Sequence, residues 1–185
     1  MCKRLFMLFC LVILIVACQP TETTETAEMT DTQRQAIAAE IRQIEQEFFD
    51  LNMLMNEEKY NKGLTYWADS DDPAWMGNPA IFVNRTKIIT TNEAFDEYWR
   101  PAVGTRGSTN FTMGTDCVAV LSPDLAIHVY DAKYSITNLE GETGPEYPMA
   151  ATSVYVKKDG EWKLLHHHQS WSDTPIETEK EEAEK

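Results

Sequence analysis

Regularly spaced apolar residues mark the first clear element of the chain, between residues 37 and 55. They recur at intervals of four, three, four, three and four residues, at Ile37, Ile41, Ile44, Phe48, Leu51 and Met55. This spacing places the side chains along one side of a helix, so it predicts a long amphipathic helix that packs on a core. Thr30 and Gln33 have the spacing of a capping box at the start of this helix, and residues 61–63 are expected to end it.

The rest of the chain changes from helical to alternating patterns. Residues 80–83 and 87–90 predict two brief strands, and Asn92 is expected to cap a second helix. The aromatic residues on one face of that helix are Phe95, Tyr98 and Trp99. Four long alternating segments, separated by turn-forming residues, then predict strands at 111–121, 125–137, 147–157 and 161–171. Helices followed by such a meander predict an α+β fold, with the helices packed on one face of a curved antiparallel sheet.

The N-terminus has the pattern of an export signal. Two basic residues precede an uncharged apolar run over residues 5–17, which is shorter than the ~20 residues that a membrane-spanning helix needs. The run ends in Ala17-Cys18, which resembles the bacterial lipobox, where the cysteine after a small residue is lipidated and becomes the new N-terminus. The alternative is an uncleaved N-terminal anchor that happens to end in cysteine.

These patterns divide the chain into four segments. We expect a lipoprotein signal peptide over 1–17, a flexible Thr- and Glu-rich linker with lipidated Cys18 over 18–31, one folded domain over 32–172, and an acidic disordered tail over 173–185. The implied location is the bacterial cell envelope, anchored by lipid and facing the periplasm or the exterior.

Charge and cysteine content narrow the function classes. The net charge of −14 becomes −16 when the signal peptide takes its two basic residues away. Such an acidic chain repels nucleic-acid phosphates, so we expect no nucleic-acid partner. Cys117 is the one cysteine left after cleavage and lipidation, so the mature chain has no intramolecular disulfide.

The last hairpin carries a family resemblance. Residues 152–170, TSVYVKKDGEWKLLHHHQS, contain a Thr, a Gly-x-Trp turn and a closing His-x-Ser. This segment resembles the closing hairpin of SnoaL-like proteins in the nuclear transport factor 2-like superfamily. The resemblance covers about residues 32–172 in the order of elements and implies a cone-like fold. Polyketide cyclases, ketosteroid isomerase-like and dehydratase enzymes and kinase association domains share this fold, so the resemblance alone does not fix a function.

The alternation of the last strand suggests candidate site residues. It places Trp162, His166 and His168 on one face, which we take to be the concave face of the cone. His168 and Asp131 are then the candidate acid/base pair, because a carboxylate among apolar neighbours can acquire a useful pKa. The candidate ligand-binding residues are Trp75, Tyr98, Trp99, Trp162 and His166. The alternative is that these histidines only line a wall.

A metal site is not expected. Consecutive strand residues point to opposite faces, so the three histidines at 166–168 cannot all bind one ion, and no zinc or calcium motif accompanies them. Asp69, Asp71 and Asp72 precede Pro73 and are interpreted as a turn. We therefore predict neither metal nor cofactor.

Three functions remain open. The leading hypothesis is a lipid-anchored extracytoplasmic domain that binds a small, largely apolar molecule in its cone. The second is a cofactor-independent isomerase, cyclase or dehydratase that uses His168 and Asp131. The third is a protein-interaction module, and we expect a homodimer formed through the sheet face that carries Lys163, Leu165 and Trp171.

Overall fold

A computed structural model of the protein describes residues 28–68, 81–84 and 87–176. The predicted signal peptide, Cys18, Trp75 and the predicted turn at 69–73 lie outside these ranges, as do residues 177–185 of the predicted tail. Among the helices that are described, none is long and apolar enough to cross a bilayer. The domain boundaries stay predictions.

Helix α2 spans Asp31–Leu51 and begins where the sequence predicts. The side chains of Thr30 and Gln33 each accept a hydrogen bond from the other residue's backbone N–H, which completes the capping box. The helix ends earlier than predicted because Asn52 adopts a left-handed conformation, with φ of 52°, which Asn tolerates better than most residues. A separate helix α3, Glu57–Leu64, follows. The predicted single helix is therefore two helices.

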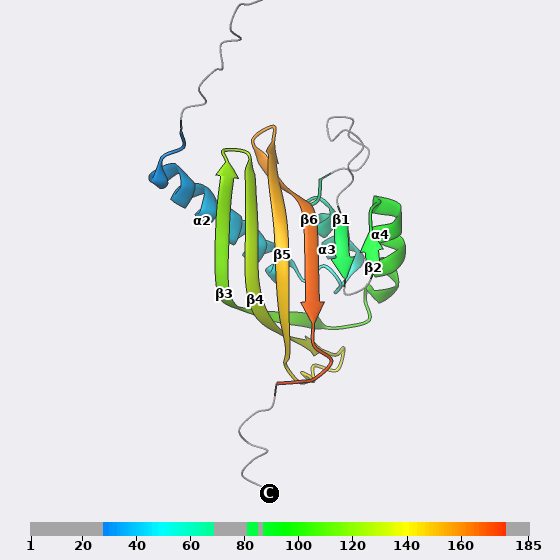
Figure 1. Ribbon diagram of the computed structural model, residues 1–185. Coiled ribbons are helices and arrows are strands. Elements are labelled where there is room, and N and C mark those ends of the chain that lie inside the picture. The colour runs from blue at the N-terminus through cyan, green and yellow to red at the C-terminus, as the bar shows by residue number, and fades with distance from the viewer. Residues whose placement is uncertain (1–27, 69–80, 85–86, 177–185) are drawn as a thin grey trace, which may run out of the picture.

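Six strands form one sheet in the order β2-β1-β6-β5-β4-β3 (Figure 1). Their bounds are β1 Ile81–Asn84, β2 Lys87–Ile89, β3 Ser108–Ser122, β4 Leu125–Thr137, β5 Tyr147–Lys158 and β6 Glu161–Trp171. The four long strands form the predicted antiparallel meander. One pairing differs from the prediction, because β1 runs parallel to β6 and makes the sheet mixed.

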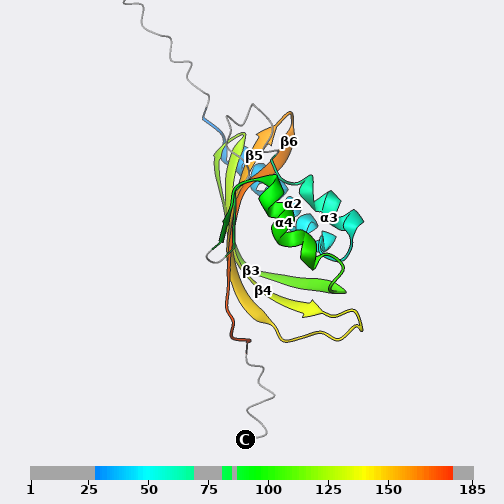
Figure 2. The same cartoon turned by 90° about the vertical axis from the view of Figure 1, so that its right-hand side faces the viewer.

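The helices lie in one layer against the concave face of the sheet. Figure 2 shows α2, α3 and α4 (Asn92–Trp99) on the same side, while the far ends of β3 and β4 bend beneath them. Thr91 caps α4, one residue before the predicted Asn92. The short 3-10 turn η2, Arg100–Ala102, leads from α4 toward β3. The cone-like α+β fold predicted from the sequence is confirmed.

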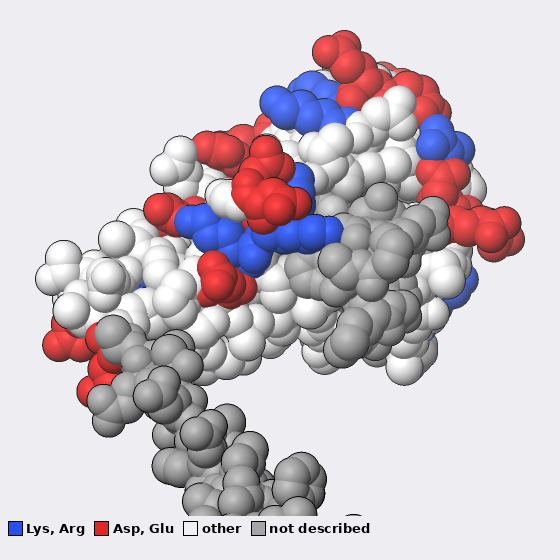
Figure 3. All heavy atoms as spheres, turned by 90° about the horizontal axis from the view of Figure 1, so that it is seen from above, with Lys and Arg blue, Asp and Glu red and all other residues white. Residues whose placement is uncertain are grey.

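An ion pair and a hydrogen bond join α2 to the β5–β6 hairpin at one end of the domain. Lys157 Nζ lies 3.3 Å from Glu40 Oε2, and Trp162 Nε1 donates to the same oxygen at 2.9 Å. Lys163 Nζ pairs with Glu161 at 2.9 Å. In Figure 3, which views the domain from above, Lys and Arg atoms lie among Asp and Glu atoms. Trp162 is buried in the core, and its hydrogen bond to Glu40 attaches it to α2.

A β-bulge in β6 reverses the faces of the strand's second half. Tyr155 of β5 pairs with Leu164, whereas Val154 pairs with His166, so Leu165 is an extra residue in β6. Side chains alternate along a regular strand, and one extra residue moves every later side chain to the opposite face. The bulge therefore decides which histidine faces the helices.

His167 is the histidine on the concave face, with only 3% of its surface exposed. His166 and His168 lie half-buried on the outer face, which we define as the sheet face turned away from the helices. Uninterrupted alternation predicted the reverse, so the expectation that His166 and His168 face the cavity is wrong.

Candidate functional site

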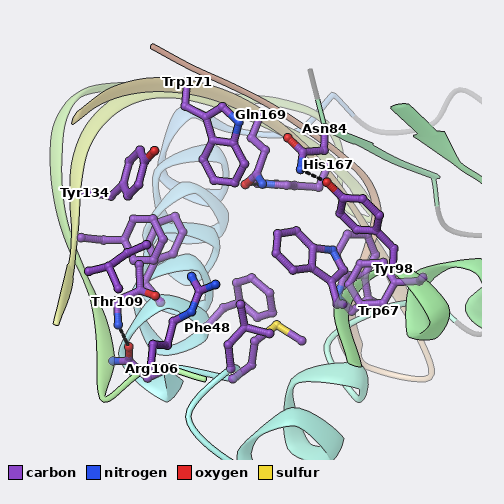
Figure 4. A pocket seen from close by; sticks show the side chains of 18 residues that line it. Phe48, Trp67, Asn84, Tyr98, Arg106, Thr109, Tyr134, His167, Gln169 and Trp171 are labelled. Atoms are coloured by element: carbon purple, nitrogen blue, oxygen red, sulfur yellow. Dashed lines mark hydrogen bonds between the residues drawn. The ribbon is translucent and has the colours of Figure 1, made fainter. Parts of the chain in front are cut away.

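A cavity of about 350 Å³ lies between the helices and the curved sheet (Figure 4). Nine aromatic side chains contribute to its wall: Phe48, Phe49, Trp67, Phe95, Tyr98, Trp99, Phe111, Tyr134 and Trp171. They come from α2, α4, the sheet and the segment after α3. Cavities of about 300–1,000 Å³ with a mainly apolar lining and a few polar groups are typical of small-molecule sites. We refer to this cavity as the pocket.

The early end of α2 helps to shape the pocket. The left-handed turn at Asn52 directs the chain away from the helix, and Asn52 Oδ1 accepts a hydrogen bond from the backbone N of Thr109 at 2.6 Å. This bond fastens the end of α2 to the start of β3. Met53 and Leu54, which follow Asn52, then line the pocket.

A few polar groups interrupt the aromatic wall. Asn84 Nδ2 donates to the hydroxyl of Tyr98 at 2.8 Å, and Asn84 Oδ1 is buried without a hydrogen-bond partner among the described residues. His167 and Gln169 contribute from β6, and Arg106 reaches in from the segment before β3 (Figure 4). These groups give the pocket the means to orient a bound molecule.

His167 connects the pocket to the interior of the sheet. Its Nδ1 lies 2.9 Å from Ser153 Oγ, and its Nε2 lies 3.3 Å from Gln169 Oε1. The edge of its ring meets Trp67, with ring centroids 6.3 Å apart. Burial lowers the pKa of His167 more than the nearby Glu45 carboxylate raises it. The imidazole is therefore neutral at neutral pH.

Glu45 of α2 is fully buried behind this histidine. Its Oε1 accepts from the hydroxyl of Tyr130 at 3.0 Å, and its Oε2 accepts from the hydroxyl of Tyr155 at 2.6 Å. Burial opposes ionisation, but hydrogen bonding with His128 and Tyr155 and the charge of the neighbouring histidines together hold the pKa of Glu45 below its usual range. Burial and the Glu45 charge raise the pKa values of both tyrosines, which stay protonated as donors.

The polar network also reaches the protein surface. His128 is fully buried, with Nδ1 3.5 Å from Glu45 Oε2 and Nε2 3.2 Å from Asp116 Oδ2. Asp116 in turn pairs with Arg42 of α2 at 2.5 Å. Polar contacts therefore run from an exposed ion pair, through the core, toward the pocket.

The ionised carboxylate of Glu45 limits the directions of the hydrogen bonds around it. An ionised carboxylate only accepts, so Tyr130 and Tyr155 donate to Glu45. Ser153 also lowers the pKa values of these phenols through hydrogen bonding, and its single hydroxyl proton can be donated to one partner at a time. When that proton goes to a phenol, the Ser153 oxygen accepts from Nδ1–H of His167. This tautomer has the lone pair of His167 on Nε2, the nitrogen that lies 3.3 Å from the side-chain amide of Gln169.

The arrangement can accept a proton from a molecule in the pocket. With its proton on Nδ1, the neutral imidazole has its lone pair on Nε2, while Nδ1 is held by a chain of donors that ends on a buried carboxylate. A carboxylate behind a histidine fixes the tautomer and stabilises the protonated ring.

Comparison with known families matches residues 60–174 to the SnoaL-like domain. The chain belongs to the SnoaL-like family. No curated protein sequence matches it significantly.

Several solved structures share the fold of this SnoaL-like domain at low sequence identity. A putative dehydratase of the NTF2-like family from Streptomyces avermitilis is 17% identical, with a TM-score of 0.61 over 78% of this chain and 99% of that one. The association domain of C. elegans CaMKII is 19% identical, with a TM-score of 0.58 over 76% and 99%. A hexachlorocyclohexane dehydrochlorinase, LinA-type3, from Novosphingobium barchaimii LL02 is 17% identical, with a TM-score of 0.56 over 80% and 94%. These likenesses show the fold.

The ligand-binding residues predicted from the sequence lie in different parts of this SnoaL-like domain. Tyr98 and Trp99 line the pocket, whereas Trp162 lies in the core outside the pocket and donates to Glu40. Trp75 is outside the described residues. Trp171, which we had expected on the dimer face, lines the pocket.

The proposed pair of His168 and Asp131 does not meet in the pocket. Asp131 lies exposed on the outer face of β4, between the buried Tyr130 and Ala132. Its Oδ1 accepts from the backbone N of Thr115 at 3.1 Å, where the register of β3 shifts. His168 lies on the same outer face, on β6, with all of β5 between the two strands. Neither residue lines the pocket.

The residues that sequence reasoning missed at the site include Glu45, Arg106 and His167. Glu45 left a signal, because it lies four residues from Ile41 and four from Phe49 and so shares their buried helix face. An acidic residue within an apolar stripe suggests a buried partner. Arg106 left no such signal, because it lies in an irregular segment.

No metal-binding cluster is present within residues 28–68, 81–84 and 87–176, where no group of three or more His, Cys, Asp or Glu side chains could hold an ion. Cys117 is exposed on β3 and forms no disulfide there. The prediction of no metal and no cofactor stays a prediction.

Proposed function

We propose that this SnoaL-like domain binds a small, largely apolar molecule in its pocket. The observation that carries the proposal is the cavity of about 350 Å³ with nine aromatic side chains in its wall. Aromatic rings that only filled a core would pack to close such a space, because protein interiors leave few voids larger than a water molecule. The aromatic wall favours a molecule with a flat ring body, and the few polar groups would set its orientation.

The test is to fill the pocket and measure binding of a neutral fluorescent probe, N-phenyl-1-naphthylamine. Thr109 and Thr112 are both on β3, but Thr109 lines the pocket and Thr112 is exposed. We expect Thr109→Trp to weaken probe binding by about tenfold or more and Thr112→Trp to leave it unchanged. Thermal unfolding would verify that both variants fold, and Ile136→Trp is a second pocket-filling change. Undiminished binding by folded pocket-filling variants would refute the proposal.

A second candidate function, cofactor-independent proton transfer, is favoured by the network behind His167. In place of the expected His168 and Asp131, the proton acceptor would be His167 Nε2, supported through Ser153 by the phenols and the carboxylate of Glu45. Structural neighbours include proteins named as a dehydrochlorinase and a putative dehydratase. The reaction class would be an isomerisation, cyclisation or elimination that begins with removal of a proton from carbon.

Hydrogen–deuterium exchange of an aromatic ketone provides a test that needs no natural substrate. The probe is 1-tetralone in D₂O, and NMR would follow loss of the protons next to its carbonyl. His167 would take a proton, the enolate would form, and deuterium from the exchanged imidazole would return to carbon. We expect His167→Gln to remove the protein-dependent exchange and His168→Gln to preserve it. Equal activity of the two variants would rule out His167 as the base.

Anchoring and assembly complete the proposal. We propose that lipid on Cys18 holds the domain on the extracytoplasmic side of a bacterial membrane, as the lipobox-like Ala17-Cys18 suggests. We also propose that two copies associate through the outer face of the sheet. Val129 and Ile88 on that face are 48% and 68% exposed, which supports an apolar contact. One structural neighbour is named as an association domain.

A further inference from the structure

Arg106 carries a positive charge into the pocket without a matching negative charge. Its side chain lines the pocket, and its Nε is buried with no hydrogen-bond partner. Among the described residues, no Asp or Glu forms an ion pair with it. Burial lowers the pKa of Arg106, an effect that only Tyr134 opposes, yet a guanidinium remains protonated in proteins.

Arg106 as a whole is half-buried. A charge that is partly withdrawn from water is costly to leave unpaired, and folded proteins normally pair it or expose it. Arg34 and Arg100 of the same chain follow this rule. Arg34 donates to the backbone carbonyl of Val120 at 2.7 Å, and Arg100 pairs with both Asp96 and Glu57 at 2.6 Å. Arg106 is different because its partner is not supplied by the described fold. The space that its side chain faces is the pocket.

The geometry points to a bound carboxylate. We propose that the pocket takes aromatic monocarboxylates, with the carboxylate on Arg106 and the ring system among the aromatic side chains. This inference rests on the proposed binding function and names the class of molecule that the pocket would bind. A planar guanidinium presents its donors in a fork that matches two carboxylate oxygens.

The rest of the site fits the same class of ligand. Figure 4 shows Arg106 entering the pocket from the side opposite His167 and Gln169. A molecule held by its carboxylate at Arg106 would therefore direct its ring body toward those two residues and Asn84. The protein as a whole is strongly acidic, with a net charge of −14, and would repel an anion at long range. Preference for an anion must therefore come from the local charge of Arg106.

Isothermal titration calorimetry with two matched probes tests the inference. The probes are 2-naphthoate and 2-naphthamide, which share the ring system and differ in charge. The protein is the chain from residue 18 to residue 185, which retains every described residue. We expect 2-naphthoate to bind about tenfold or more tightly than 2-naphthamide, because hydrogen bonds to charged groups are about twice as strong as neutral ones.

The variant Arg106→Gln should bind the two probes with equal affinity. Its affinity for 2-naphthoate should fall, whereas its affinity for 2-naphthamide should change by less than about threefold. Arg34→Gln removes the same charge outside the pocket and should keep the wild-type preference. Arg106→Lys keeps the charge without the planar fork and should retain part of the preference, and thermal unfolding would verify each fold.

The outcomes separate this inference from the binding function. If the wild-type protein binds both probes equally, the pocket function stands and the carboxylate preference is refuted. If Arg106→Gln still prefers 2-naphthoate, the role of Arg106 is refuted. If that variant does not fold, an unchanged preference for 2-naphthoate in Arg106→Lys refutes the fork geometry. If neither probe binds below about 1 mM, the proposed binding function fails and this inference fails with it.

Discussion

Replacing Glu45 by Gln should destabilise the domain and change how its stability depends on pH. Gln keeps the size of the side chain and one acceptor oxygen but exchanges the other oxygen for an NH₂ donor. Glu45 accepts from Tyr130 at 3.0 Å and from Tyr155 at 2.6 Å, so one phenol would face a donor in the variant. The buried hydroxyl would then have no acceptor at that position.

The size of the effect follows from the number of partners lost. A buried donor left without an acceptor costs about 1–3 kcal/mol, so Glu45→Gln should lower the free energy of unfolding by about that amount. Glu45→Ala leaves both phenols without their acceptor and opens a cavity, so its cost should exceed that of Glu45→Gln. Glu47 is exposed on the same helix, and Glu47→Gln should stay within about 0.5 kcal/mol of the wild type.

Urea denaturation at several pH values would measure these differences. Because the folded pKa of Glu45 lies below its ordinary value of 4.5, the carboxylate contributes its full stabilisation above about pH 4.5. That contribution is lost as the pH falls below 4.5 toward the folded pKa. The gap between the wild type and Glu45→Gln should therefore be widest near pH 7 and narrow in acid. A gap below about 0.5 kcal/mol at pH 7, or one that does not narrow in acid, would contradict an ionised Glu45.

Three further predictions follow from other parts of the molecule. Cys18→Ser should abolish incorporation of a fatty-acid analogue in metabolic labelling, and continued labelling would refute lipid attachment at that residue. Val129→Asp places a charge on the outer face and should convert the proposed dimer to a monomer in sedimentation, and a wild type that is already monomeric at high micromolar concentration would exclude the dimer. Arg106→Met removes a half-buried unpaired charge and should leave the melting temperature of the ligand-free protein unchanged or higher, whereas a marked loss would assign Arg106 to the fold.

The element boundaries could be predicted wherever local chemistry decides them. The strand bounds at 125–137 and 161–171 are those expected, because turn residues stand at both hairpins. Asp159 and Gly160 both adopt positive φ, 52° and 85°, as a two-residue hairpin turn requires. The capping box at Thr30 is likewise a local signal, because its two partners are three residues apart.

The site could not be predicted in the same way, because its geometry depends on contacts between distant segments. The bulge at Leu165 is an extra residue in β6 relative to β5, and nothing in the alternating pattern of either strand marks its position. A shift of one residue exchanges the two faces of a strand. The pattern of residues 161–171 therefore predicted the strand correctly but predicted the wrong histidines on its concave face. The parallel pairing of β1 with β6 joins segments about 80 residues apart and left no local signal.

The fully buried Glu45 and the half-buried Arg106 differ in what satisfies their charges. Glu45 has its partners within the fold, two phenols and a nearby histidine, so its cost of burial is offset when the chain folds. Arg106 gains no such partner from the described residues, so its cost remains until something enters the pocket. Proteins retain a destabilising group where function needs it, and stability and activity then oppose each other. This contrast assigns Glu45 to the stability of the cone and Arg106 to its ligand.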